Sequence, residues 1–130
     1  MTRLEIVGLY VAIHCVMLII LAFRVGQVRM KERISLGDGN NFRLQQRIRT
    51  HGNYVEYTPM ALIGLFALAQ LSASPLMLHV FGLTFLIGRL LHIVGMDGKH
   101  AIGKGRPAGM VLTILTFIGL AGSILFLIFT

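Results

Sequence analysis

The sequence has few of the residues that cover the surface of a soluble enzyme. Only 13% of its 130 residues are charged, whereas 55% are hydrophobic, and it contains five acidic residues and no tryptophan. A soluble domain of this length needs a larger polar surface. The single cysteine, Cys15, excludes an intrachain disulfide. The composition therefore predicts an integral membrane protein, and the length predicts a single domain over residues 1–130.

The net charge of +7 does not indicate a nucleic-acid partner. The basic residues flank long apolar runs, which is the arrangement that membrane topology requires. Aromatic residues do not alternate with basic ones, and no cysteine or histidine spacing matches a zinc site. We therefore expect no nucleic acid and no metal, and we expect membrane lipids around the chain.

Four stretches of sequence are mainly apolar over the roughly 20 residues that a membrane-spanning helix needs. They cover residues 5–25, 47–71, 75–96 and 108–129. The second stretch is polar in its first two turns, and the fourth carries no charge. The pattern predicts an all-α membrane protein, built as a bundle of four transmembrane helices.

The connections between these spans differ in charge, and the difference predicts the orientation in the membrane. Seven basic residues lie in or near the first connection, and Lys99, Lys104 and Arg106 lie in the third. The opposite side has only Arg3. Because cytoplasmic connections are rich in lysine and arginine, we expect both basic connections in the cytoplasm and both termini outside.

Polar residues form a ladder on one face of the second span. Arg49, Asn53 and Glu56 stand at positions i, i+4 and i+7 of the expected helix, and Tyr57 follows. The ladder covers roughly 10 Å of helix axis at 1.5 Å per residue. Arginine offers a forked donor to a carboxylate and glutamate offers a partner to an ammonium group, so the ladder suits a ligand that carries both. The alternative is an ion-pair network that holds the helices together.

Two further polar residues, Arg89 and His92, stand one turn apart inside the third span. An ionisable residue inside a membrane is costly and indicates a functional site. We expect Glu56 to pair with Arg89, because it is the only carboxylate within a span apart from Glu5 at the edge of the first. His92 either donates to a ligand or is simply hydrogen-bonded in the bundle. Arg29, which ends the first span, also fits a side chain that reaches the membrane interface.

Three short motifs, one on each of the first three spans, occur in a recognisable order. They are Gly26-Gln27-Val28-Arg29, then Arg49-x-x-x-Asn53-x-x-Glu56 followed by Tyr57 and Pro59, then Gly88-Arg89-x-x-His92. Together they resemble the MAPEG family, the membrane-associated proteins in eicosanoid and glutathione metabolism, and most of all its short bacterial members. No Ser-His-Asp set accompanies them, so any chemistry needs a nucleophile that the small molecule supplies.

The resemblance implies a homotrimer in a bacterial inner membrane, with glutathione bound between neighbouring subunits near the cytoplasmic side. The implied activity is that of a membrane glutathione transferase or peroxidase. Such an enzyme holds glutathione as a thiolate and presents it to hydrophobic electrophiles or lipid hydroperoxides from the bilayer. The family pattern assigns glutathione binding to Arg29 of the adjacent subunit and to Arg49, Asn53, Glu56, Tyr57, Arg89 and His92.

Two departures from the family pattern concern the chemistry. Met96 stands where well-studied members have a tyrosine, and methionine cannot donate a hydrogen bond. The arginine that is thought to stabilise the thiolate in active members has no unambiguous counterpart, because its position falls near Gly105. We assign the catalytic role to Arg106, which directly precedes the fourth span, with Lys104 and Arg29 as alternatives.

Two other functions compete with the transferase. The first is a non-catalytic member of the same scaffold that binds glutathione or another small anion. The second is a small multidrug transporter, which would share the size and the number of spans. Such transporters resemble this chain less, because they rely on a membrane-buried carboxylate in the first helix, where this chain has only Glu5 at the edge.

Overall fold

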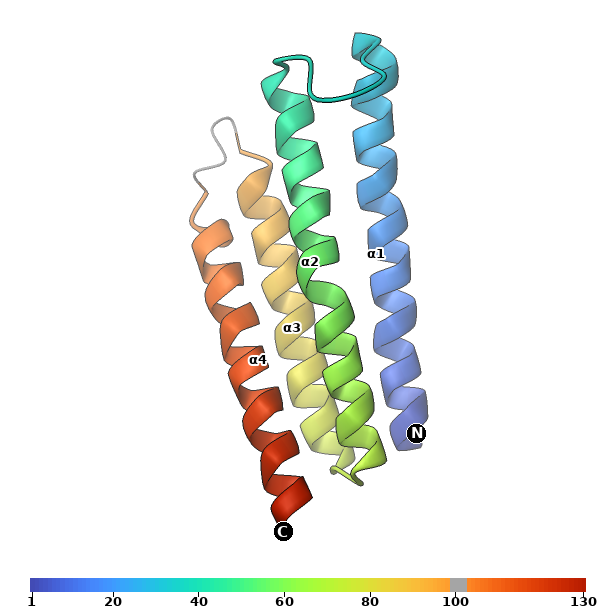
Figure 1. Cartoon of the computed structure of the whole chain (residues 1–130), viewed down its shortest axis with the longest axis vertical. Helices are drawn as coiled ribbons and strands as arrows, with labels where there is room; N and C mark the ends of the chain where they lie inside the picture. Colours follow the sequence, from blue (N-terminus) through green and yellow to red (C-terminus); the bar gives the residue numbers. More distant parts are fainter. Residues whose placement is uncertain (99–102) are drawn as a thin grey trace.

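Four helices make up most of the described chain, as the all-α prediction requires. The computed structural model describes residues 1–98 and 103–130, so Lys99 of the third connection lies outside the described residues. The helices are α1 (Arg3–Glu32), α2 (Phe42–Gln70), α3 (Pro75–Met96) and α4 (Gly105–Phe129). They run side by side in alternating directions, with both chain termini at one end of the bundle and the long α1–α2 connection at the other (Figure 1).

Local sequence signals set three of the helix starts. Thr2 and Glu5 form a capping box on α1, in which each side chain accepts a hydrogen bond from the backbone N–H of the other, at 3.2 and 2.8 Å. Asn41 caps α2 and Ser74 caps α3 immediately before Pro75. Because the cap of α2 precedes the apolar stretch, this helix begins more than a turn ahead of the expected span.

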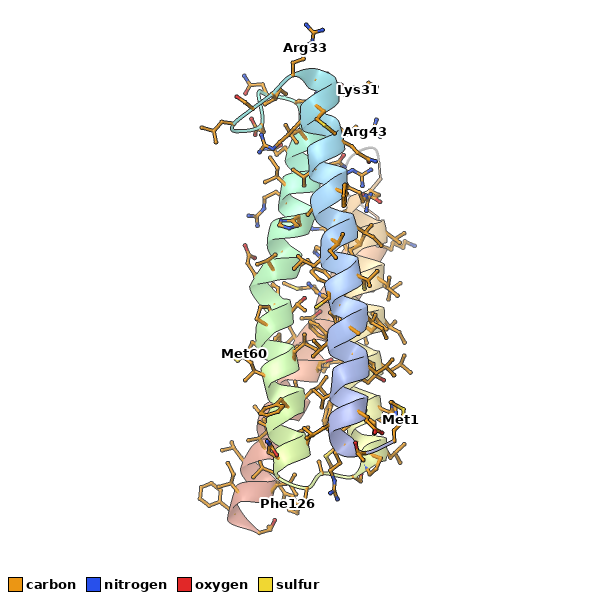
Figure 2. The ribbon with its side chains drawn as sticks, turned by 90° about the vertical axis from the view of Figure 1, so that its right-hand side faces the viewer. Met1, Lys31, Arg33, Arg43, Met60 and Phe126 are labelled. Atoms are coloured by element: carbon orange, nitrogen blue, oxygen red, sulfur yellow. The ribbon has the colours of Figure 1, made fainter. Side chains whose placement is uncertain are left out.

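The bundle presents apolar side chains outward. Among the described residues, α1, α3 and α4 are long and apolar enough to cross a membrane, whereas α2 does not reach that threshold because its first half is polar. Large hydrophobic side chains are nevertheless exposed on α2 too, including Met60, Ile63 and Phe66. Met60 and Phe126 of α4 both lie on the outside of the bundle (Figure 2). An exterior of this kind suits a bilayer, so the protein is an integral membrane protein.

Glycines bring the backbones of α3 and α4 into contact. A Cβ atom added at Gly109 would lie 2.4 Å from the carbonyl oxygen of Gly88 and 2.5 Å from the backbone nitrogen of His92. Nearer the connection, a Cβ atom added at Gly95 would lie 2.7 Å from the carbonyl carbon of Gly105. Small residues at the contact are the usual means by which transmembrane helices approach closely. These contacts fix the start of α4 against the end of α3.

We predict that Gly109→Ala destabilises the bundle by about 1–3 kcal/mol, because its methyl group would collide with backbone atoms that cannot move aside. The measurement is reversible unfolding in detergent. Gly122→Ala on the same helix is the matched control, since a Cβ atom there meets nothing within 4 Å. The control should be neutral or slightly stabilising, and equal stabilities for the two variants would contradict the close approach of α3 and α4.

Candidate functional site

One buried arginine joins three helices inside the bundle. Arg89 of α3 is 1% exposed, and its Nη1 donates to Asn53 Oδ1 on α2 at 2.9 Å. Its Nη2 donates to the hydroxyl of Thr113 on α4. The guanidinium also lies 5.3 and 5.6 Å from the ring centroids of Tyr57 and Phe85. Aromatic faces attract cations, most strongly where water is excluded, so Arg89 is held by neutral oxygens and aromatic rings.

The expected pairing of Arg89 with Glu56 is wrong for the single subunit. Asn53 and Tyr57 lie one turn apart on the side of α2 that faces Arg89, and Glu56 is rotated about 100° from Tyr57. The Glu56 side chain is instead 54% exposed, and its Oε1 lies 3.9 Å from Nη1 of Arg49. A pair this exposed adds little stability. It leaves both charged groups accessible to a ligand or to a neighbouring subunit.

Thr113 is a site residue that the sequence analysis missed. It is fully buried, and its hydroxyl accepts from Arg89 while donating to the carbonyl oxygen of Gly109 at 2.8 Å. The sequence did contain a signal for this role, namely a threonine one turn after a glycine in an apolar span. Threonine in a transmembrane helix bonds to its own backbone and across to neighbouring helices, and glycine allows the close approach that this requires.

A cleft opens at the end of the bundle that carries the first and third connections. It has a volume of about 180 Å³ and is lined by residues of α2, α3 and the start of α4. It brings together four of the predicted site residues, and its walls also include Gln46 and the apolar side chains of Phe42 and Met96. The four predicted residues are Arg49, Asn53, His92 and Arg106.

The other predicted site residues lie outside this cleft. Arg29 is on α1, where its Nη1 donates to the carbonyl oxygen of Ile34 at 3.5 Å, and it lines a separate hollow at the end of that helix. Tyr57 is half-buried beneath Arg89, and Glu56 is exposed on α2. Asn53 is therefore the link between the cleft and the buried Arg89, because it lines the first and accepts from the second.

Polar contacts hold the rim of the cleft. The carboxylate of Asp97, just after α3, accepts from Arg24 of α1 and from Arg47 of α2. Gln46 Nε2 donates to the carbonyl oxygens of the residues on either side of Asp97, at 3.0 and 2.7 Å. The end of α3 is thus tied to α1 and α2. The glycine contacts tie the start of α4 to the same end of α3, and they therefore fix the position of the Arg106 backbone at the cleft.

The cleft combines cationic and apolar side chains. Arg49 and Arg106 line it together with the amide of Asn53, and no carboxylate among the described residues lines it. Such a set favours an anion, because guanidinium groups match carboxylates with two parallel hydrogen bonds. Ligand pockets for small molecules usually have volumes of roughly 300–1,000 Å³. The cleft is smaller than this range.

We predict that Thr113→Val lowers the free energy of unfolding by about 1–3 kcal/mol, because it leaves a donor of the buried Arg89 guanidinium without its acceptor. Thr116→Val is the matched control on the same helix: Thr116 is equally buried, and its hydroxyl donates to the carbonyl oxygen of Leu112 at 2.8 Å. Thermal unfolding in detergent measures both. If the two variants lose the same stability, the Arg89–Thr113 bond is not a significant support of the site.

Comparisons with known proteins identify the family. The chain is 36% identical over 106 residues to the inner membrane protein YecN of Escherichia coli strain K12, which covers 82% of this chain and 79% of that protein. The protein of the same name from Escherichia coli O6:H1 gives the same values. No solved structure matches the chain. The model of the MAPEG family matches residues 7–126, and the chain therefore belongs to the MAPEG family.

Proposed function

We propose that this protein is a glutathione transferase or peroxidase of the membrane, which acts on hydrophobic electrophiles or lipid hydroperoxides that arrive from the bilayer. The observation that carries the proposal is the cleft that joins Arg49, Asn53, His92 and Arg106 in a member of the MAPEG family. Glutathione has two carboxylates, an ammonium group and a thiol. The cleft offers the forked donor of Arg49 to a carboxylate, and the exposed Glu56 one turn beyond Asn53 offers a partner to the ammonium group.

The proposed assembly is a homotrimer of four-span subunits. Helices α1 and α3 run in the same direction, so a chain that crosses the membrane with both must cross back with α2, although α2 alone is too polar to be recognised as a span. A neighbouring subunit would add its own residues to the small cleft and so enlarge it. Its Arg29 would be among them, because Arg29 does not reach the cleft of its own subunit. Contacts with that neighbour would also cover the exposed Arg49–Glu56 pair.

The proposed orientation follows from charge. The basic connections α1–α2 and α3–α4 lie at the same end of the bundle as the cleft, and that end is assigned to the cytoplasm. Glutathione would then enter from water, whereas an apolar substrate would enter from the lipid side. The similarity to an inner membrane protein of Escherichia coli supports the inner membrane as the location.

The proposed reaction uses the thiolate of glutathione as the nucleophile. Its sulfur forms a bond to an electrophilic carbon while the leaving group departs with the bonding electrons of the bond that breaks. A cation beside the sulfur lowers the pKa of the thiol and raises the fraction of thiolate at neutral pH. Arg106 lines the cleft and is the proposed source of that cation.

One observation favours a second function, a glutathione-binding protein without catalysis. Met96 lines the cleft and is 6% exposed, at the position where a tyrosine is expected in well-studied members. A thioether cannot donate a hydrogen bond to a thiolate. In this alternative the cleft binds glutathione but does not activate it.

We predict that Arg49→Ala weakens glutathione binding by about 1–3 kcal/mol, the usual effect of leaving a charged partner unpaired, and that Glu56→Gln weakens it in the same direction. Isothermal titration with the purified protein measures both. Arg33→Ala is the control, because Arg33 is an exposed cation at the same end of the bundle and does not line the cleft. If all three variants bind glutathione as well as the parent protein, the polar ladder is structural and the proposed site is wrong.

We predict that Arg106→Ala lowers turnover with a reactive aryl halide much more than it weakens glutathione binding. The reason is that Arg106 is proposed to stabilise the reacting thiolate and not to hold the rest of the glutathione molecule. Steady-state rates and binding are measured on the same preparations. Met96→Tyr is expected to raise the rate, because it restores a donor near the sulfur. Unchanged turnover in Arg106→Ala would move the role to Lys104 or Arg29, and glutathione binding without turnover in the parent protein would favour the non-catalytic function.

A further inference from the structure

A second hollow lies between α1 and α2 at the end of the bundle that carries the basic connections. Its volume is about 160 Å³, and it shares no lining residue with the cleft described above. Four of its lining residues are basic and one, Glu32, is acidic. The basic residues are Arg24, Lys31, Arg43 and Arg47. We call this hollow the basic pocket.

The four cations of the basic pocket are not equivalent. Arg24 and Arg47 share the carboxylate of Asp97, so part of their charge is already matched. Lys31 and Arg43 are exposed, and within the described part of the chain neither forms an ion pair or a side-chain hydrogen bond. Both side chains lie on the same side of the bundle near that end (Figure 2). The pocket therefore keeps two cations that are free to bind an anion.

The basic pocket lies where the apolar surface of α1 ends. Ile19, Ile20 and Phe23 are each more than half exposed on this helix, and Arg24 follows them directly. Side chains of this kind contact lipid tails when the helix crosses a bilayer, and basic residues just beyond them lie at the depth of the lipid headgroups. An anion bound in the pocket would thus be at the membrane surface, with apolar side chains beneath it.

We propose that the basic pocket binds the phosphate group of an anionic phospholipid, with Lys31 and Arg43 as the principal donors and the acyl chains along Ile20 and Phe23. Lysine and arginine both bind phosphate, and basic pockets between transmembrane helices on the cytoplasmic side suit lipid headgroups. The apolar surface next to the pocket favours a lipid over free phosphate. This inference does not depend on glutathione binding, because the two hollows have no lining residue in common.

The test is native mass spectrometry of the protein released from detergent, with phosphatidylglycerol, phosphatidylcholine or inorganic phosphate added separately. The variants are the double substitution Lys31→Gln with Arg43→Gln, the charge-preserving swap Lys31→Arg with Arg43→Lys, and Arg33→Gln as control. Arg33 is an exposed cation at the same end and does not line the basic pocket. The number of subunits in the assembly, calculated from its mass, should be the same in every variant and serves as the check on folding.

We expect the parent protein to retain phosphatidylglycerol in preference to phosphatidylcholine, and inorganic phosphate not to displace it. The double substitution should weaken phosphatidylglycerol binding about 30-fold, the effect of removing two cations from an anionic membrane surface. The charge-preserving swap and Arg33→Gln should bind like the parent. Equal retention of phosphatidylglycerol by the double substitution, or its displacement by inorganic phosphate at comparable concentration, would overturn the proposal.

Discussion

A buried guanidinium without a carboxylate partner is the constraint on which the bundle depends. Removing a charge from water costs several kcal/mol unless hydrogen bonds and nearby charge compensate for it. Arg89 receives that compensation from Asn53, Thr113 and two aromatic rings, contributed by α2, α4 and α3. Because three helices supply these groups, the position of Arg89 fixes how they rotate against one another.

The same contact connects the interior of the bundle with the cleft. Asn53 accepts from Arg89 and also lines the cleft, so its amide is oriented by the buried cation and not by solvent. Helix α1 is joined to this layer by a different contact, the hydrogen bond between His14 and Tyr54. At the rim, Asp97 and the glycines of α3 and α4 hold the end of α3 and the start of α4 together. Contacts of this kind hold the residues around the cleft in place, as a site needs in order to orient a small ligand.

The sequence was sufficient to predict the four helices, but it was not sufficient to predict which face of each helix contacts its neighbours. Apolar length predicted the four helices. Arg49 and Asn53 of the polar ladder line one cleft, whereas Glu56 does not. The Arg89–Glu56 pair was wrong within the bundle, because a rotation of about 100° about the axis of α2 decides which ladder residue meets α3. Thr113 was missed for the same reason, since its role appears only where glycines bring α3 and α4 together. The trimer and the glutathione site remain predictions.

The most direct test of the proposed function is the ultraviolet difference spectrum of the purified protein with glutathione at neutral pH, which reports thiolate. The account predicts a thiolate signal that saturates with glutathione, that needs more glutathione to saturate in Arg49→Ala, and that falls in Arg106→Ala at saturating glutathione. A protein that binds glutathione without any thiolate signal would contradict the catalytic role. A protein that binds no glutathione would contradict the assignment of the cleft itself.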